Sequence, residues 1–359
     1  MRRAGRSTRL LAAALAFTAA GVAATALPGI GAAPAQAQDS HLLVVVGLGG
    51  DDAYRERFLG WALTLRTAAM ERYGLSAEQA VILAEDPEMD PAVVGESRRE
   101  RFVAELEALA TRVSPDDRVL LVLIGHGSFR GGEANFNIPG RDLGASELGV
   151  LLDAVPTERV AIVNTASASG PYVQALSAAG RTVITATASG GERNETQFGE
   201  HFAAAWEDDQ ADLDKNGAVS LLEAFQYARR ETARFYEERN LLLTEHALLD
   251  DDGDGEGTRE PTIETADGAT AASFTLGMPG ARSAATATAT GAARPIPATA
   301  DSVLARLYGE RAGLEERVAE LRRLRDSMDP DIYESELEAL LVDLALKSRE
   351  IRAREGGEG

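Results

Sequence analysis

Side chains with oxygen atoms recur at every second position in one acidic segment of the chain. Asp212, Asp214 and Asn216 alternate with other residues, Gly217 follows them, and Glu223 lies further along. Calcium is a hard cation that prefers a ring of oxygen ligands, and a glycine at this point permits the sharp turn that such a ring needs. The spacing therefore predicts a calcium (Ca²⁺) site whose ligands are Asp212, Asp214, Asn216, the carbonyl oxygen of Ala218, Ser220 and Glu223.

Residues 212–223 match the loop of the EF-hand, a helix–loop–helix calcium motif. The apolar Val219 at loop position eight is expected to tuck beneath the loop. Helical patterns predict flanking helices over 194–209 and 221–239, so the complete EF-hand spans 194–240. A solvated acidic turn is the alternative interpretation, but it does not account for a match at every diagnostic position.

A second acidic loop, residues 250–260, repeats the first half of this pattern. Asp250, Asp252 and Asp254 stand at positions one, three and five. Position twelve would be Pro261, whose side chain cannot bind a metal, so Glu256 or Glu260 would have to complete the site irregularly. The segment is either a partial calcium loop that partners the first one or an acidic turn without a ligand.

Two predicted strands end at polar residues that could do chemistry. Residues 118–124 and 159–163 are apolar and rich in β-branched side chains, as expected for parallel strands covered on both faces. His126 and Gly127 follow the first strand, and Ser167 follows the second. Because ligands gather at the carboxyl ends of neighbouring parallel strands, we expect His126 and Ser167 to lie on one edge of the sheet.

The order and spacing of these residues resemble the caspase-like cysteine peptidases, and the legumain branch in particular. Legumain-type sequences read Asp-His-Gly after the first strand and Glu-Ala-Cys-Glu-Ser-Gly after the second. Here the chain reads Gly-His-Gly at 125–127 and Thr-Ala-Ser-Ala-Ser-Gly at 165–170, and the resemblance covers residues 42–206. The chain departs from the family at the nucleophile, because Ser167 replaces the catalytic cysteine and the sequence contains no cysteine.

The resemblance implies that His126 handles protons, that Gly127 donates an oxyanion hydrogen bond and that position 167 carries the nucleophile. A serine hydroxyl, unlike a thiol, needs an oriented general base at the moment of attack. The sequence identifies no acid that would orient His126. We therefore expect an inactive relative that binds peptides or proteins, with a calcium-dependent serine peptidase using Ser167 and His126 as the alternative. A strand-end histidine and a helix-capping serine are the plain structural interpretation.

The first 37 residues predict a secretory signal peptide. Four arginines precede an apolar run over 10–27, and Ala-Gln-Ala at 35–37 offers a cleavage site. The signal contains four of the 36 Lys+Arg and none of the 57 Asp+Glu, so cleavage changes the net charge from −21 to −25. Such acidity argues against nucleic acid as a partner. We expect an extracytoplasmic protein, periplasmic or secreted, with no membrane span in the mature chain.

Alternating strands and amphipathic helices predict an α/β fold with a mostly parallel sheet, and the resemblance makes this a caspase-like three-layer sandwich. The expected strands are 42–46, 81–84, 118–124, 159–163 and 181–186, with a late strand at 273–276, and the expected helices include 97–113 and 147–154. Residues 129–144 are rich in glycine, which predicts a looped flap over the strand ends.

The chain divides into a signal peptide (1–37), an α/β domain (38–277), a linker (278–300) and a C-terminal piece (301–354). The linker is rich in Ala, Thr, Gly and Pro. Leucines at seven-residue spacing on both sides of Pro330 predict an α-helical hairpin or coiled coil. The apolar side chains of this hairpin have to be buried against another part of the chain or another molecule. A third function class is therefore an oligomeric structural or assembly protein that associates through 301–354.

Overall fold

The computed structural model describes residues 38–277, the helix α10 (Pro330–Glu355) and five single positions, 307, 314, 317, 318 and 321. A seven-stranded sheet forms the centre of residues 38–277, in the order β10-β9-β8-β4-β1-β2-β3. Neighbouring strands run parallel except β10, which is antiparallel to β9. The strands are β1 (Ser40–Val46), β2 (Ala80–Ala84), β3 (Val93–Glu96), β4 (Arg118–Ile124), β8 (Val160–Asn164), β9 (Arg181–Thr185) and β10 (Leu248–Asp250).

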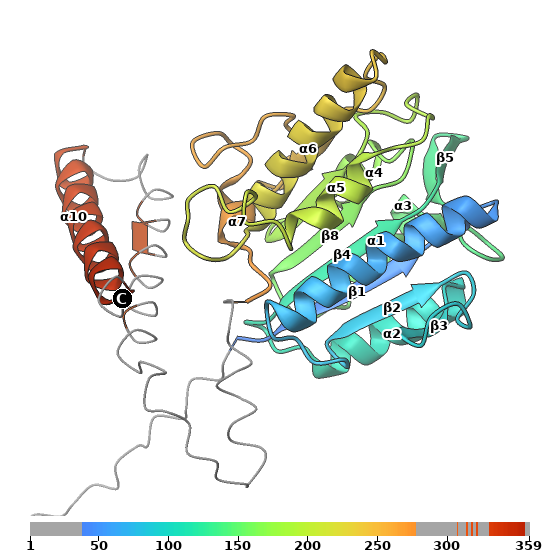
Figure 1. Ribbon diagram of the computed structural model, residues 1–359, viewed down its shortest axis with the longest axis horizontal. Coiled ribbons are helices and arrows are strands. Elements are labelled where there is room, and N and C mark those ends of the chain that lie inside the picture. Colours follow the sequence, from blue (N-terminus) through green and yellow to red (C-terminus); the bar gives the residue numbers. More distant parts are fainter. Residues whose placement is uncertain are drawn as a thin grey trace, which may run out of the picture. The chain divides into compact units, whose positions relative to one another are not determined.

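Helices cover both faces of this sheet (Figure 1). One core is formed with α1, α5, α6 and α7, and the other with α2, α3 and α4. This layered arrangement confirms the predicted α/β class with a mostly parallel sheet. The helices are α1 (Asp52–Glu71), α2 (Arg99–Arg112), α3 (Ala145–Leu152), α4 (Tyr172–Leu176), α5 (Phe198–Ala205), α6 (Leu221–Glu238) and α7 (Ala269–Ser273).

Successive residues of the central strands point into different cores. In β1, Leu42 and Val44 belong to one core, and Leu43 and Val45 belong to the other. This alternation follows from the two-residue period of a strand. All four side chains are at most 2 % exposed. Burial on both faces is the reason that these strands read as continuous apolar runs in the sequence.

A second, three-stranded antiparallel sheet follows His126. It consists of β5 (Gly127–Arg130), β6 (Glu133–Phe136) and β7 (Leu143–Gly144). The prediction that residues 129–144 are looped was therefore wrong. Gly131 and Gly132 both have positive φ, 62° and 88°, and they form the two-residue turn of a tight hairpin.

Three further predictions were wrong in detail. β3 was missed because only Val93 of its four residues is buried, so it leaves no apolar run. The late strand expected at 273–276 is the end of α7, followed by an isolated bridge between Thr275 and Ser220. The helix expected over 194–209 is shorter at both ends and spans only α5.

The C-terminal helix α10 begins at Pro330, a residue suited to the first helical turn because it needs no backbone N–H there. Val318, Leu321 and Leu340 form a small buried cluster, the kind of contact that a hairpin of two helices predicts. The predicted signal peptide (1–37) and linker (278–300) lie outside the described residues. Among the helices that the structure describes, none is both long and apolar enough to cross a membrane.

Candidate functional site

The predicted strand-end residues lie next to one another. β4 and β8 are neighbours, with Leu123 opposite Asn164. Beyond these ends, the Ser167 hydroxyl accepts a hydrogen bond from the Gly127 N–H at 3.3 Å and donates one to the Gly127 carbonyl oxygen at 3.2 Å. The structure thus brings Ser167 against the segment that carries His126, and it leaves the hydroxyl occupied by backbone groups.

His126 is held by aromatic contacts rather than by an acid. Its ring meets Tyr54 and Phe58 edge-on, with centroid distances of 4.9 Å and 5.1 Å. Burial lowers the pKa of the imidazole, and a hydrogen bond to the backbone of Gly49 opposes this shift. Within residues 38–277, no hydrogen bond joins His126 to Ser167 or to a carboxylate. The arrangement therefore lacks the base–nucleophile contact and the orienting acid of a catalytic triad.

Glu195, the acid with the largest electrostatic effect on His126, is engaged elsewhere. The Tyr54 hydroxyl donates to Oε2 of Glu195 at 2.6 Å, and Arg57 forms an ion pair with the same carboxylate. The Arg57 guanidinium also lies over the Tyr54 ring, 4.8 Å from its centroid. The hydrogen bond to Glu195 raises the pKa of the Tyr54 hydroxyl. Sequence reasoning missed this cluster because Tyr54 and Glu195 are 141 positions apart.

The turn that carries Ser167 is tight. A Cβ on Gly127 would lie 2.3 Å from the Ser167 carbonyl oxygen, so no side chain fits there. Ala168 has a left-handed φ of 54°, and its N–H donates to the Glu192 carbonyl oxygen at 2.7 Å. A left-handed conformation at a residue with a side chain costs on the order of 1 kcal/mol. The packing around Ser167 therefore holds a strained backbone in place.

A polar cleft of about 530 Å³ lies beside the small sheet, apart from His126 and Ser167. Because its walls are charged and open, it does not resemble the mostly apolar pockets that enclose small ligands. Its position therefore does not add to the case for chemistry at the strand ends. It is lined by Glu133, Asn135, Arg141, Asp142, Gly144, Ser146 and Glu147.

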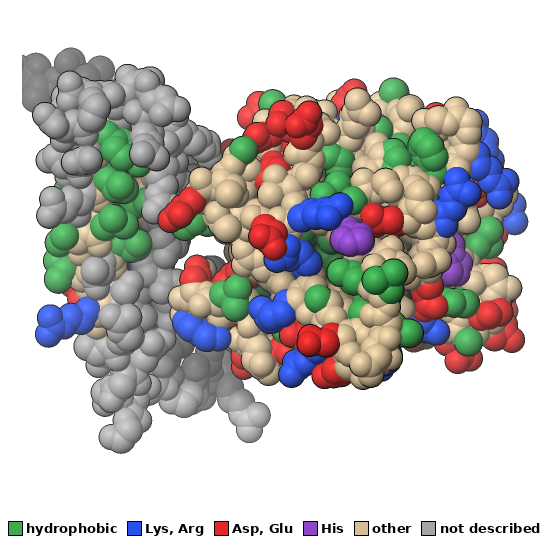
Figure 2. Space-filling model, turned by 90° about the horizontal axis from the view of Figure 1, so that it is seen from above, with side chains coloured by type: hydrophobic (Ala, Val, Ile, Leu, Met, Phe, Trp, Pro, Cys, Tyr) green, Lys and Arg blue, Asp and Glu red, His purple; other side chains and the backbone are tan. Residues whose placement is uncertain are grey.

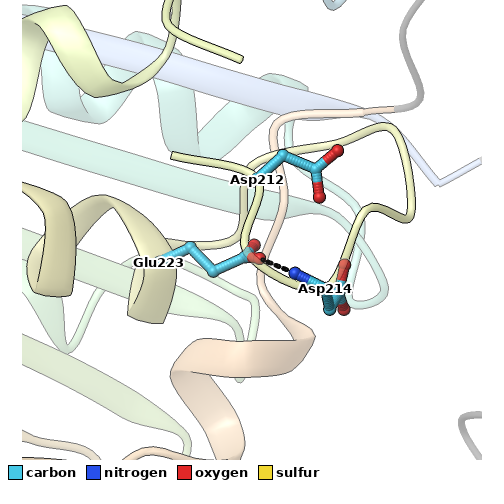
Figure 3. Close-up of side chains that lie close together, drawn as sticks. All are labelled: Asp212, Asp214 and Glu223. Carbon is cyan, nitrogen blue, oxygen red and sulfur yellow. Dashed lines mark hydrogen bonds between the residues drawn. The ribbon is translucent and has the colours of Figure 1, made fainter. Parts of the chain in front are cut away.

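The first acidic loop connects α5 to α6 and gathers three carboxylates. Asp212, Asp214 and Glu223 lie close together there (Figure 3). One oxygen of each lies within 4.8 Å of the others. Oxygens that bind one Ca²⁺ at about 2.4 Å can be at most about 4.8 Å apart, so this spacing fits a single ion.

Backbone N–H groups hold the loop in this shape. Asp212 accepts hydrogen bonds from the N–H groups of Asn216 (3.1 Å) and Gly217 (3.0 Å). Glu223 accepts one from Leu213 through Oε1, at 2.8 Å. Gly217 has a φ of 93°, the left-handed turn for which the sequence predicts a glycine. The described loop therefore has the turn of an EF-hand loop and its acids turned inward.

Glu223 also starts the helix that follows. Its Oε2 accepts from the Ser220 N–H (2.8 Å) and hydroxyl (2.7 Å), while the Ser220 hydroxyl accepts from the Glu223 N–H. This reciprocal capping box satisfies free donors at the first turn of α6. Val219 is fully buried beneath the loop, as predicted, and its N–H donates to the Tyr73 hydroxyl at 3.2 Å.

The charge of this cluster lacks a counter-ion among the residues that the structure describes. Burial raises the pKa of the Asp214 carboxyl, and the neighbouring Glu223 carboxylate adds to the shift. Lys215 turns away and donates to the Asp209 carbonyl oxygen at 3.0 Å. In the part of the chain that the structure describes, no Lys or Arg forms an ion pair with Asp212, Asp214 or Glu223. A divalent cation would supply the missing positive charge.

The second acidic loop gathers its carboxylates in the same way. Oxygens of Asp250, Asp252 and Asp254 also lie within 4.8 Å of one another. The two loops are not joined by a β-bridge in the described chain, although the sequence suggests that they partner each other. The bridge at Ser220 goes to Thr275.

A buried acid that no sequence pattern indicates joins the two helices beside the first loop. Glu245 accepts hydrogen bonds from the N–H groups of Gln197 (2.7 Å) and Phe198 (3.1 Å) at the start of α5. It also accepts one from the Tyr236 hydroxyl of α6 at 3.1 Å. Burial raises the pKa of Glu245 to about 7. The sequence separations between Glu245 and its hydrogen-bond partners follow no helical or strand period, so a periodicity argument could not have identified this residue.

Comparison with known protein families and with curated proteins gives no match for this chain. The fold and the sites define an α/β protein with two acidic clusters that could hold a metal ion. Its function has to be argued from the geometry of those clusters and of the strand ends.

Proposed function

We propose that the protein binds calcium through the EF-hand loop at residues 212–223. The observation that carries the proposal is the convergence of Asp212, Asp214 and Glu223 oxygens within 4.8 Å of one another. All predicted donors are oxygens, which favours calcium over zinc, a metal that takes histidine and cysteine ligands. Isothermal titration of chelator-treated protein should detect binding, and Asp212→Asn should weaken it by at least about tenfold. Glu207→Gln, an exposed charge change nearby, is the matched control.

We further propose that the scaffold is caspase- and legumain-like and binds a peptide or protein at its strand ends without cleaving it. Support comes from the His126–Gly127 and Ser167 segments on neighbouring strands. The Ser167 hydroxyl is bound to both backbone groups of Gly127, and the same N–H is the oxyanion donor that the resemblance implies. In this state neither the Ser167 hydroxyl nor the Gly127 N–H is free for catalysis.

A calcium-dependent serine peptidase using Ser167 and His126 is the second candidate, favoured by the position of Ser167 against the segment that carries His126. A serine-reactive phosphonate probe separates the two candidates when it is applied with and without calcium. We expect no labelling of Ser167 in either condition. Labelling that disappears in His126→Ala would establish the peptidase and refute the inactive binder.

An assembly role is the third candidate, and exposed apolar side chains on α10 favour it. Leu341, Val342 and Leu346 are 41 %, 51 % and 52 % exposed. Such side chains on one helix suit association through 301–354 in a homo-oligomer. Light scattering of the full chain and of a truncation after Ala300 tests this role. An unchanged oligomeric state would count against it.

We also propose that the protein is exported and that it does not bind nucleic acid. Acidic and basic side chains are interspersed on the face that Figure 2 shows, without the extended basic surface that phosphate backbones require. The predicted signal peptide would place the mature protein outside the cytoplasm. Cell fractionation and sequencing of the mature N-terminus test this location, with Gln38 as the expected first residue.

A further inference from the structure

Two consecutive aspartates at the end of β10 are both buried, but they differ in the hydrogen bonds that their carboxylates accept. Asp250 is 0 % exposed and Asp251 is 6 % exposed. The Asp251 carboxylate accepts N–H hydrogen bonds from Gly268 (2.8 Å) and Ala271 (2.7 Å), so it caps the start of α7. Asp250 accepts one, from Gly253 to Oδ1 at 3.1 Å, and its buried Oδ2 has no hydrogen-bond partner.

An orphaned carboxylate oxygen of this kind needs an explanation. Burying a charged group without a partner is among the costliest arrangements in a protein. The Ser177 hydroxyl lies near the Asp250 carboxyl and opposes the rise in its pKa that burial causes, but neither Ser177 Oγ nor Asp250 Oδ2 has a well-formed hydrogen bond. The Asp250 carboxylate is thus buried with one well-formed hydrogen bond, from Gly253, and a weaker contact to Ser177.

The other acids of the loop converge on the same place. Oxygens of Asp252 and Asp254, both exposed, lie with one of Asp250 inside the 4.8 Å limit for ligands of one calcium ion. Within the described residues, none of the three forms an ion pair. By contrast, Glu260 further along the loop pairs with Arg229 at 3.1 Å.

We propose that Asp250, Asp252 and Asp254 form a second calcium site, which works independently of the EF-hand loop. The cation supplies the partner that the Asp250 Oδ2 lacks, and the two exposed aspartates close the site from the solvent side. Backbone carbonyls and waters complete the oxygen shell. No histidine belongs to the cluster and the chain has no cysteine, so a zinc site is disfavoured.

The second site binds more weakly than the first. Position twelve is Pro261, Glu260 is held by Arg229, and Glu256 does not belong to the carboxylate cluster, so no bidentate glutamate completes the shell. Dissociation constants of about 10⁻⁴ to 10⁻³ M are typical of sites in extracellular calcium modules. Gly253 packs closely on the segment that follows α4, where an added Cβ would lie 3.2 Å from the Ala178 backbone. The ion would therefore fasten the edge strand β10 to that segment.

The test measures calcium binding by isothermal titration and equilibrium dialysis in the full chain. Glu223→Gln removes the bidentate ligand of the first loop, so the second site is observed alone in that background. Asp252→Asn and Asp254→Asn are added to it separately, because both residues are exposed and neither change disturbs the core. Glu264→Gln, an exposed acid after the loop, is the control of equal charge change.

We expect the Glu223→Gln chain to keep one calcium ion, with affinity reduced at least about tenfold by Asp252→Asn or Asp254→Asn and unchanged by Glu264→Gln. Absence of binding up to about 10 mM calcium in a Glu223→Gln chain with parental circular dichroism would overturn the proposal. Equal affinity in the aspartate variants and the control would overturn it as well. Failure of the EF-hand proposal looks different, because parental binding would then be unaffected by Glu223→Gln.

Discussion

Glu223→Gln separates two roles that one side chain performs. Glu223 is the predicted bidentate calcium ligand, and it also closes the capping box with Ser220 at the start of α6. Glutamine can serve in a capping box as glutamate does, but it cannot offer two anionic oxygens to a metal. Because the amide keeps only one accepting oxygen, either the Leu213 N–H or the Ser220 N–H loses its acceptor, and stability without calcium should fall by about 1 to 3 kcal/mol. The substitution should also remove most of the stabilisation that calcium provides.

The size of the effect follows from mass action. EF-hand sensor sites have dissociation constants of about 10⁻⁷ to 10⁻⁵ M. With about 10⁻⁵ M and about 1 mM calcium, the ion stabilises the folded chain by about 2.7 kcal/mol. For a domain of about 240 residues this raises the melting temperature by roughly 5 to 10 °C. A hundredfold weaker variant retains only about 0.4 kcal/mol at the same calcium concentration.

Differential scanning calorimetry with excess chelator and with calcium measures both quantities. The control is Glu207→Gln, which removes one exposed charge near the loop and should keep the full calcium shift. The reasoning fails if Glu223→Gln gains as much from calcium as the parent does. It also fails if the parent gains nothing, because the three carboxylates would then not be a calcium site.

Other predictions concern stability and the strand ends. Because burial raises the pKa of Glu245 to about 7, from an ordinary 4.5, the folded chain binds a proton more tightly than the unfolded chain, and this stabilisation is lost as pH rises between about 4.5 and 7. Glu245→Gln should flatten that part of the stability profile in urea titrations with chelator, and parallel profiles would contradict the assignment. Gly127→Ala should destabilise by roughly 1 to 3 kcal/mol or more, because its Cβ would lie 2.3 Å from a carbonyl oxygen. Gly60→Ala, in α1 with open space around it, should instead stabilise by about 0.5 to 1 kcal/mol, so equal effects of the two changes would refute the steric argument.

The sequence predicts the parts of this fold whose signals are local. Runs such as Leu120–Leu123 are apolar without alternation because both faces of the sheet are covered, and this alone indicates parallel strands. The acidic loop is equally predictable from the sequence, since residues Asp212 to Glu223 lie close together in the chain and their expected roles depend on spacing. The adjacency of Ser167 and Gly127 follows from the rule that strand ends share an edge.

The sequence does not predict what depends on contacts between distant segments. The start of α5 shifts to Phe198 because the residues before it are bound elsewhere: Glu195 by Tyr54, and Thr196 by the Thr165 carbonyl oxygen at 2.6 Å. Glu245 then caps the delayed helix from 47 positions away. Residues 194–197 are all polar, and the apolar residues at helical spacing begin at Phe198, so the prediction placed the start of the helix before its periodic signal.

The acidic loop 212–223 and the strand ends are held near opposite ends of one helix, α1, which bears on what a bound ion could do. Tyr54 and Phe58 near the start of α1 pack on His126. Beyond the other end of α1, the Tyr73 hydroxyl accepts a hydrogen bond from the Val219 N–H of the acidic loop, and its ring meets Trp206 edge-on at 5.7 Å. A helix of 20 residues spans about 30 Å, so the ion acts far from the imidazole. Calcium should therefore stabilise the helices that hold the strand ends in place, and it should not take part in chemistry at His126.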